Sequence, residues 1–572
     1  MSKVSLIKTS FNAGELSPRL DGRIDIDKYS NGCSVLENFI PLVQGGIMKR
    51  PGTQYISSTK NNQKVWLAKF EFTYSQSFIL EFGPQYIRFY FNHGQLLSGS
   101  VPYEVATPYT SDDITTTEGT FGLSMAQTGD VIYIATRNHP PGKLSRFGNT
   151  NWQYSVVDFK EGPFQDNNTN KNIDIAIYPL QTFIGTNFQE YNTTAYAMGG
   201  NIFTPEMVGT LVQVEVTNDP NIKPWYSQIS PPTSKVTNVG DIVRNDGKYY
   251  GCNMSIDNKK TWYVAPTHTD GGRWDGDEIS WWYLADEIGI VRITQYVSPT
   301  QAEVRVIRQV ANVYNGNEAY TWAWSKAAWR SDLGYPDQVI FFRERLVFAR
   351  DQHVWFSCSG DYENFAAKEF GEVLTDSAIN FDITSEDASP IKYMATTPQG
   401  LICGTNADQV LITAASLAEP FGPDNIRVAP GSGIGGKQIN PVKVDQSILI
   451  IQRSGRKLIN TQYDSSSDFF NSPDQTVIAD HILSPGIIDM AWQRDPWDIL
   501  WMVRADGQLV GFTFNQQQQV IGFHRHITDG NIEAVQVIPS PDGSRDDLWM
   551  VVRRQIEATT VRYVELKLID LL

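Results

Sequence analysis

The feature that most constrains this chain is a β-hairpin pattern that recurs at nearly constant spacing. Its clearest example is residues 498–514 (DILWMVRADGQLVGFTF), in which two runs of β-forming residues flank Asp506-Gly507. Glycine accepts the positive φ of a tight hairpin turn, so this dipeptide between apolar runs is a strong hairpin signal. Similar hairpins are anchored at Ile79, Ile132, Leu346, Ile402, Leu449, Leu500 and Leu548.

Neighbouring hairpins mostly lie about 50 residues apart, which suits a propeller blade of four short strands. The interval between Ile132 and Leu346 is much longer, and it leaves an insertion of ~160 residues after one blade-length is subtracted. We therefore expect a mostly β fold: a β-propeller of about six or seven blades with an N-terminal arm and a large inserted β-rich region. The expected segments are an arm and docking segment at 1–60, the first part of the propeller at 61–165, the insertion at 166–330 and the remaining blades at 331–572.

Composition narrows the class of protein further. A chain of 572 residues is too long for one ordinary core, and its abundant aromatic residues, glycine and proline favour strands and turns. The formal charge of −16 argues against tight nucleic-acid binding, which needs a surface of Lys and Arg. Four scattered cysteines indicate neither a disulfide framework nor a zinc site. No run of apolar residues reaches membrane-spanning length and no secretory signal is evident, so we expect folding in a reducing cytoplasm.

The N-terminal 60 residues do not follow the blade pattern. Residues 24–39 carry apolar side chains at spacings compatible with one short amphipathic helix, although Asn31-Gly32 weakens it. Lys49 and Arg50 lie beside turn glycines, a combination that could bind phosphate. A structured arm whose arginine pairs with a carboxylate explains the same residues, and we favour it.

A small module within the insertion, at about residues 222–286, has an unusual density of Trp and Tyr. Flat aromatic faces suit the apolar faces of sugar rings, whereas a module this small also needs large side chains simply to build a core. We expect a core role for most of them, with two or three available as an exposed platform. The candidates for binding a glycan or a partner are Trp225, Tyr249, Tyr250, Trp262, Trp274, Trp281 and Trp282.

Two motifs suggest chemistry that their context does not support. Residues 431–438 (GSGIGGKQ) match two phosphate-binding patterns, but Pro430 precedes them and Pro441 follows, so no helix can begin there. We interpret this segment as a loop between blades. His524 and His526 share one face of a strand and could ligate a metal, but no third ligand is evident in the sequence. We favour packing and hydrogen bonding for both.

Carboxylates are frequent enough to imitate the acid pair of a glycosidase, as in Asp361 with Glu363 or Asp498 with Asp506. Hydrolysis needs two carboxyl groups held roughly 5–10 Å apart across the sugar, and that separation does not follow from sequence. No Ser-His-Asp or Cys-His arrangement has a recognisable local context. We predict a protein that is not an enzyme and that has no catalytic residue, metal site or cofactor.

Long ordered segments of the chain resemble a known family. The opening FNAGELSPRLDGRIDIDKYSNGCSVLENFIPLVQGGIMKRPGTQYI resembles that of the tail nozzle proteins of short-tailed bacteriophages, also called tail tubular protein B or stabilisation proteins. Further similar segments are DVIYIATRNHPPGKLSRFGNTNW, GPF at 162–164, GYP with VIFFRERLVF, SGDYENF, IGFHRHITDG and LWMVVRR. The resemblance spans nearly the whole chain except about 166–330.

This resemblance implies a structural virion protein of the phage tail, folded in the host cytoplasm before assembly. Such proteins form a ring, here expected to be a hexamer, below the portal and the tail adaptor protein, and they dock a tail fibre or spike protein. Phage DNA would pass through the lumen without specific binding. The residues that match the docking arm of the family are Arg23, Asp25, Tyr29, Arg50 and Pro51. The alternative is a glycan-binding or glycan-cleaving propeller that acts on host surface polysaccharide.

Overall fold

The protein is represented by a computed structural model that describes residues 8–181, 183–216, 223–224, 238–256, 265–275, 279–311, 319–368, 372–383, 389–416, 418–464 and 469–568. These residues form strands, the single short α-helix α1 (Ser111–Ile114) and four 3-10 turns. The turns are η1 (Pro18–Leu20), η2 (Asp27–Tyr29), η3 (Lys60–Asn62) and η4 (Pro205–Met207). None of the described helices has the length and apolarity that a membrane crossing requires.

The described part of the chain contains seven antiparallel sheets that follow the propeller pattern, each with four strands in order from the centre outward. Blades 1 and 2 are β6 (Trp66–Thr73), β7 (Gln76–Gly83), β8 (Tyr86–Phe91) and β12 (Glu104–Ala106), then β13 (Ser124–Thr128), β14 (Val131–Thr136), β15 (His139–Gly148) and β16 (Asn151–Val156). Blades 3 and 4 are β29 (Gln338–Phe342), β30 (Arg345–Arg350), β31 (His353–Phe356) and β32 (Ile379–Asp382), then β33 (Ile391–Thr396), β34 (Leu401–Thr405), β35 (Gln409–Thr413) and β36 (Arg427–Pro430).

The remaining blades complete the ring. Blades 5 and 6 are β37 (Val442–Val444), β38 (Ser447–Ile451), β39 (Leu458–Asp464) and β40 (Phe469–Asn471), then β41 (Ile487–Gln493), β42 (Ile499–Arg504), β43 (Leu509–Asn515) and β44 (Val520–His526). Blade 7 is β45 (Asn531–Pro539), β46 (Asp546–Ile556), β47 (Thr559–Lys567) and β5 (Thr53–Ser58). Blade 1 also carries β9 (Gly94–Gln95), and β10 (Leu97–Ser98) and β11 (Val101–Pro102) form a small hairpin beside it.

The predicted β-propeller is confirmed, and the blade count is seven. Every hairpin anchor taken from the sequence, from Ile79 to Leu548, lies in the second strand of a blade. The turn after β42 has the expected chemistry, because Gly507 has a φ of 87° and its N–H donates to the carbonyl oxygen of Arg504 at 2.9 Å. The recurrence of one hairpin per blade therefore specified the repeat correctly.

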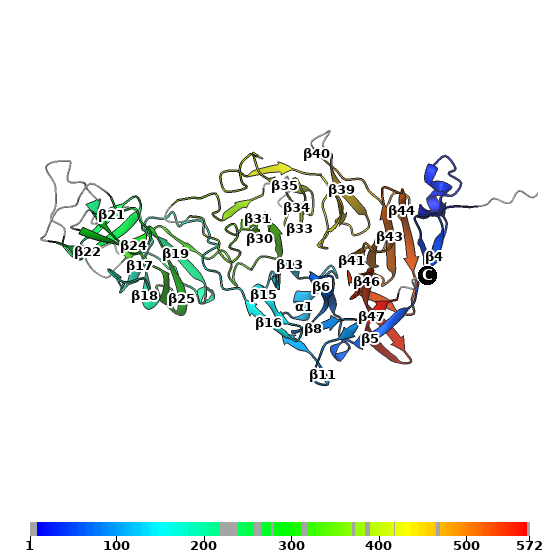
Figure 1. The fold of residues 1–572 in the computed structure, drawn as a ribbon, viewed down its shortest axis with the longest axis horizontal. Helices are drawn as coiled ribbons and strands as arrows, with labels where there is room; N and C mark the ends of the chain where they lie inside the picture. The colour runs from blue at the N-terminus through cyan, green and yellow to red at the C-terminus, as the bar shows by residue number, and fades with distance from the viewer. Residues whose placement is uncertain are drawn as a thin grey trace, which may run out of the picture.

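The ring closes because strand β5, from the N-terminal region, pairs antiparallel with β47 at the C-terminal end. The expectation that residues 1–60 lie outside the blades is wrong for β5, which forms the fourth strand of blade 7. The two strands come from opposite ends of the sequence, so no local pattern reveals their pairing. Figure 1 shows the consequence: blades coloured from blue through green to red follow one another around the centre, and the first lies beside the last.

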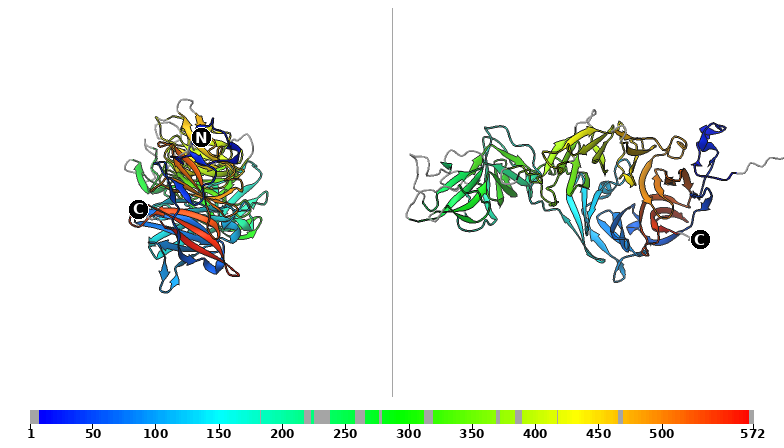
Figure 2. Two further views of the ribbon diagram at one scale, coloured as in Figure 1. Left: turned by 90° about the vertical axis from the view of Figure 1, so that its right-hand side faces the viewer. Right: turned by 45° about the horizontal axis from the view of Figure 1, so that its top comes forward.

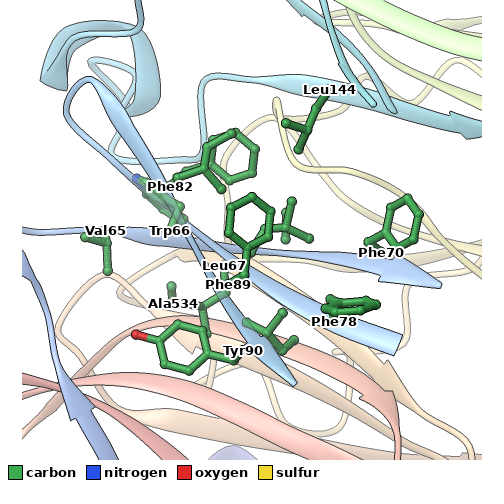
Figure 3. Packing of buried hydrophobic residues seen from close by; sticks show 14 of the residues in the cluster. Val65, Trp66, Leu67, Phe70, Phe78, Phe82, Phe89, Tyr90, Leu144 and Ala534 are labelled. Atoms are coloured by element: carbon green, nitrogen blue, oxygen red, sulfur yellow. The ribbon is translucent and has the colours of Figure 1, made fainter. Parts of the chain in front are cut away.

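Apolar side chains fill the interfaces between all seven pairs of adjacent blades. The largest cluster joins blades 7, 1 and 2, and it is built on rings such as Trp66, Phe78 and Trp549. Figure 3 shows part of this cluster, including Trp66 and Phe78, with Ala534 and Tyr90 at the boundary with blade 7. Each blade thus buries both of its faces against a neighbour, which explains its runs of consecutive apolar residues.

The N-terminal arm lies against the outer edge of blade 6. Strand β1 (Gly14–Glu15) adds in parallel to β44 and to β2 (Gly32–Cys33), and β3 (Phe39–Pro41) pairs with β4 (Ile47–Lys49). The helix expected at residues 24–39 is wrong, because this stretch contains only the turn η2 before Gly32 enters the parallel sheet. Backbone pairing to blade 6 outweighs the weak helical periodicity.

The insertion contains two sheets. The larger has the order β27-β17-β18-β26-β25-β19-β28, formed by β17 (Asp174–Tyr178), β18 (Tyr191–Met198), β19 (Leu211–Glu215), β25 (Ile288–Ser298), β26 (Gln301–Arg308), β27 (Ala319–Thr321) and β28 (Trp324–Lys326). The smaller is the aromatic module, with β20 (Lys223–Pro224), β21 (Ile242–Asn245), β22 (Lys248–Ser255), β24 (Ile279–Asp286) and β23 (Gly272–Asp275) in that order. The β25–β26 hairpin turns at Pro299, between the paired residues Ser298 and Gln301.

Two paired chain segments, which we call the stalk, connect the insertion to the ring. The stalk is formed by residues 163–165 and 326–328, in which Gln165 N–H donates to the Lys326 carbonyl oxygen at 2.8 Å and Ala328 N–H to that of Pro163 at 2.9 Å. The insertion and the arm extend from opposite ends of the long axis of the molecule (Figure 1, and the right view of Figure 2). Neither adds a strand between adjacent blades.

Because the ends of the stalk are adjacent, the insertion should be removable. Replacing residues 167–325 with a short Gly-Ser linker is expected to leave a folded seven-bladed ring, since all inter-blade clusters lie outside that range. Circular dichroism should show a β spectrum and one cooperative thermal transition. As a control, removing residues 1–58 deletes β5 and should abolish that transition. Loss of folding in the first variant would contradict the separation of ring and insertion.

Candidate functional site

The aromatic module uses three of its predicted binding residues as core. Tyr249, Tyr250 and Trp281 are at most 1% exposed, and the Tyr250 hydroxyl donates to the His268 carbonyl oxygen at 3.0 Å. Burial excludes these three from a sugar platform, which corrects that hypothesis. The physical reason is the one weighed against it: this small sheet has few other large apolar side chains with which to build an interior.

Two of the other predicted aromatics remain accessible. Trp274 is 51% exposed and Trp282 is half-buried, and the pairing of Gly272 with Trp282 and of Trp274 with Ser280 places both rings on one face of the sheet. Gly272 has no side chain because a Cβ there would lie 2.8 Å from the Trp282 ring. Trp225 and Trp262 lie outside the described residues. The structure thus brings together two of the seven candidates, not the whole set.

The five residues predicted for the docking arm divide between its tip and its root. At the tip, the Arg23 guanidinium donates two hydrogen bonds of 2.7 Å to Asp25 and holds the pKa of that exposed carboxyl at about 2. The Tyr29 hydroxyl accepts from the Gly22 N–H at 3.1 Å. At the root, Arg50 donates to the Ile527 carbonyl oxygen at 3.1 Å and Pro51 is buried. Of these five, the tip residues lie beside the exposed Ile24 and are placed to meet another molecule.

The sequence did not identify the residue that fastens the arm, which is Glu15. Its buried carboxylate accepts from Arg525 Nε at 3.0 Å and from Leu36 N–H at 2.8 Å, and it lies 2.9 Å from His481 Nε2. Gly14, with a φ of 66°, lets the chain approach β44 so closely that a Cβ would lie 2.5 Å from the Phe523 carbonyl oxygen. The Ala13-Gly-Glu15 segment could have drawn attention to this contact, but its partners lie about 500 residues away.

His524 and His526 are buried in the seam between blades 6 and 7. His524 Nδ1 lies 2.6 Å from His526 Nε2, and both rings pack near Trp501. Burial lowers the pKa of His524 to about 3 and that of His526 well below its usual value, so both are neutral. No group of three metal-ligating side chains occurs within the described ranges. The pair is part of the interior of the seam, as the favoured interpretation predicts.

Lys567 lies in the same seam, and none of the described acidic side chains forms a salt bridge with it. Its ammonium group is 4.4 Å from the centroid of the Trp501 ring, the residue is 1% exposed, and Nζ has no hydrogen-bond partner among the described residues. Burial, followed by the nearby charge of Arg50, lowers the pKa of Lys567 to about 7. A lysine in this state is a net cost to folding at neutral pH and below.

The phosphate-like motif and the carboxylate pairs have structural roles. Residues 431–438 form the predicted loop between blades 4 and 5, and Gly435 is needed there because a Cβ would collide with the Asn406 carbonyl oxygen at 1.8 Å. Asp361 and Glu363 accept hydrogen bonds from Lys160 and Lys143 at 2.8 Å and 2.6 Å. Asp506 pairs with Arg504, and Asp498 accepts from Asn515 at 3.0 Å. These carboxylates are engaged in ordinary stabilising contacts.

The centre of the propeller is narrow. A cavity of about 80 Å³ lies among the innermost strands and is lined by apolar and amide side chains together with Asp489. The Asp489 carboxylate accepts from the backbone N–H groups of Val535 and Met490, and burial raises its pKa to about 7. A space of this volume has room for only a few water molecules.

A wider cleft, of about 620 Å³, lies where the stalk leaves blade 3. Strands β31 and β32 of that blade form one side of it, and residues 164–166 and Ala328 form the other. Its lining residues come from five separate segments and include carboxylate, amide, imidazole and guanidinium groups. Sequence reasoning missed this cleft entirely, because no single segment carries a recognisable motif.

Comparisons with known proteins identify no family. No protein-family model matches the chain, and no curated protein matches it. Among solved structures, the chain is similar to the C-terminal WD40 domain of Sif2, at 7% identity over 91% of this chain and 100% of that chain with a TM-score of 0.34. It is also similar to a protein described as a 6-phosphogluconolactonase from Bacteroides uniformis, at 11% identity over 70% of this chain and 95% of that chain with a TM-score of 0.26. The propeller assignment rests on the seven sheets themselves.

Substitution of the module tryptophans should separate core from surface. We expect Trp281→Ala to destabilise the insertion by about 3–5 kcal/mol, because it removes a buried ring. Trp274→Ala should change stability by less than about 0.5 kcal/mol, because half of that side chain is in water. Limited proteolysis with mass spectrometry would measure cleavage within residues 222–286. Equal protection of both variants would contradict the assigned roles.

Replacing Lys567 with Met should stabilise the ring in a pH-dependent way. An unfolded lysine titrates near ~10.4, whereas the pKa of Lys567 in the folded protein is about 7. At pH values between these two pKa values, the unfolded wild-type chain binds more protons than the folded one, so the stability of the wild type rises with pH. The difference in unfolding free energy between the variant and the wild type therefore shrinks. We expect a gain on the order of 3 kcal/mol at neutral pH that nearly disappears at about pH 10. Urea unfolding at several pH values would measure this gain in stability, with Lys443→Met, at an exposed lysine, as the control. A gain that does not change with pH would contradict the lowered pKa of Lys567.

Proposed function

We propose that the protein is a structural subunit of the tail nozzle of a short-tailed bacteriophage. In this proposal copies of the chain close into a ring, expected to be a hexamer, below the portal and the tail adaptor protein. The lumen of the ring, rather than the channel of one propeller, conducts DNA during ejection, and the outer surface docks a fibre or spike protein. The protein folds in the host cytoplasm and functions in the virion tail.

The observation that carries this proposal is the arm. Its root is locked to blade 6 by the buried Glu15, while Ile24 at its tip is 85% exposed and Val35, next to the root residue Leu36, is 58% exposed. A large apolar side chain that is so exposed on a segment fixed by a buried ion pair suits a contact with another chain. The insertion at the opposite end of the long axis offers a second, independent contact region (Figure 1).

Two further properties favour a wall unit of a conduit. A closed propeller is stiff, because each blade is packed on both faces and the ring leaves only short edges for other molecules. The formal charge of −16 makes the average surface repel a polyanion, so DNA would slide past without being held. The carboxylates that could imitate a hydrolase are paired with cations or amides, which gives no support to the enzymatic alternative.

Assembly of the purified chain tests this function. We expect negative-stain images and mass measurement to show rings with an open lumen, either for the protein alone or after addition of a portal–adaptor complex. The double variant Ile24→Asp, Val35→Asp should remain monomeric with an unchanged thermal transition, because the two side chains are already in water. The matched control Val428→Asp, on the outer strand of blade 4, should still assemble. A wild-type chain that stays monomeric on the complex would contradict the proposal.

A further inference from the structure

The cleft beside the stalk has a floor that is fixed by its own contacts. The register of β31 and β32 places His353 opposite Asp382 and Trp355 opposite Asn380. His353 Nδ1 lies 2.7 Å from Asp382 Oδ1, and the imidazole packs on the Trp355 ring with 4.3 Å between centroids. Trp355 is 3% exposed, so the side chains that line the floor are held in place by a buried aromatic residue.

The rim of the cleft is equally constrained. The Asp351 carboxylate accepts two hydrogen bonds from Arg137, at 2.8 Å and 3.0 Å. Arg350 donates to the Ala328 carbonyl oxygen at 3.1 Å, which ties the rim of blade 3 to the stalk. The cleft is therefore a preformed hollow between two parts of the fold, a position that small-molecule sites commonly occupy.

Its charges decide which class of ligand fits. Asp166, Asp351 and Asp382 line the cleft against one guanidinium, that of Arg350, so phosphates and other anions would be repelled. A metal ion is also poorly served, because Asp351 and Asp382 already bind Arg137 and His353. No cluster of three metal-ligating groups is found in the described part of the protein. An organic cation would meet only the carboxylate of Asp166, because the other two are paired, so the lining favours an uncharged ligand.

Unused hydrogen-bonding groups indicate the chemistry of that ligand. The side chains of Asp166, Gln352 and Asn380 line the cleft and have no hydrogen-bond partner within the described ranges. Carboxylate oxygens accept hydrogen bonds, and amides both donate and accept. Hydroxyl groups on adjacent carbons can do both at once, so a polyol matches this set. The volume of about 620 Å³ lies within the usual range for small-molecule sites, roughly 300–1,000 Å³.

We propose that the stalk cleft binds a neutral saccharide. Asp166, Gln352 and Asn380 would bind sugar hydroxyls, and the imidazole of His353 would contact the ring from the floor. The site is separate from the aromatic module, since none of its lining residues lies between 222 and 286. It also goes beyond the proposed structural function, because a ring subunit needs no such site. Its position at the root of the insertion would place a bound glycan against both the ring and the stalk.

Titration of the full chain with defined sugars tests this inference. The probes are glucose, galactose, mannose, N-acetylglucosamine and their linear dimers, followed by saturation-transfer NMR and calorimetry. We expect saturable binding of at least one of them, weakened about tenfold or more by the double variant Gln352→Ala, Asn380→Ala, which loses two hydrogen-bonding side chains. The control Gln516→Ala, Gln517→Ala removes two exposed amides from the β43–β44 turn and should bind as the wild type does.

The outcomes separate the ligand classes. Failure of every sugar to bind, or binding that the cleft variant does not weaken, would overturn the proposal. Saturable binding of inorganic phosphate or of an oligolysine peptide that the cleft variant abolishes would also overturn it, by assigning the cleft to a charged ligand. Thermal transitions of the two variants should match that of the wild type, which keeps a loss of binding distinct from a loss of folding. Ring assembly is measured separately, so failure here leaves the nozzle proposal standing.

Discussion

The pairing of β5 with β47 is the interaction on which the rest of this structure depends. It joins the two ends of the sequence within blade 7 and turns a row of sheets into a ring. With the ring closed, blade 7 is packed on blade 6 on one face and on blade 1 on the other, and no blade is left with an apolar face in water. Thr53 reinforces the closure, since its hydroxyl donates to Glu565 at 2.7 Å.

The seam between blades 6 and 7 is strong enough to accommodate buried groups that are unfavourable on their own. Lys567 and His526 each have a buried nitrogen with no hydrogen-bond partner in the described part of the chain, a defect that costs about 1–3 kcal/mol per group. The fully buried ring of Trp501, which packs against both Lys567 and His526, offsets part of that cost.

Closure also determines how the arm can act. The chain must reach β5 from outside the ring, and on the way it runs along β44 and contributes Gly14 and Glu15 to the edge of blade 6. A segment fixed in this way cannot change its position without disturbing the ion pair with Arg525. Its tip, in contrast, makes few contacts with the propeller, and Ile24 is left in water. Rigid attachment at the root combined with an exposed apolar tip lowers the ordering cost of binding another chain, because the tip is already held in place.

The sequence predicted what depends on local pattern and missed what depends on distant pairing. Alternating strands around turns such as Asp506-Gly507 are encoded within a few residues, so the hairpin period identified the second strand of every blade and the position of the insertion. Strand β5 was assigned to the arm, because its partner lies about 500 residues away. The aromatic module shows the same limit: side-chain type cannot distinguish Trp274, which is exposed, from Trp281, which is buried, since that depends on which face of a strand meets the core. The cleft forms only where five separate segments meet, so no single part of the sequence predicts it.

The stalk explains how one chain can combine a stiff ring with other binding surfaces. The insertion leaves and returns through adjacent segments, and Gln165 and Lys326 are joined by a backbone hydrogen bond at the crossing. The ring therefore needs only that its two connecting segments stay together, whatever the insertion contains. The same geometry creates the cleft, because the stalk lies beside strands β31 and β32 of blade 3 without filling the space between them. Arg350 links the stalk to blade 3 at this point, and Arg308 of the insertion binds Glu161 at 3.0 Å beside it. A ligand held in the cleft would touch the ring and the base of the insertion together, so its binding would resist any hinge motion of one against the other.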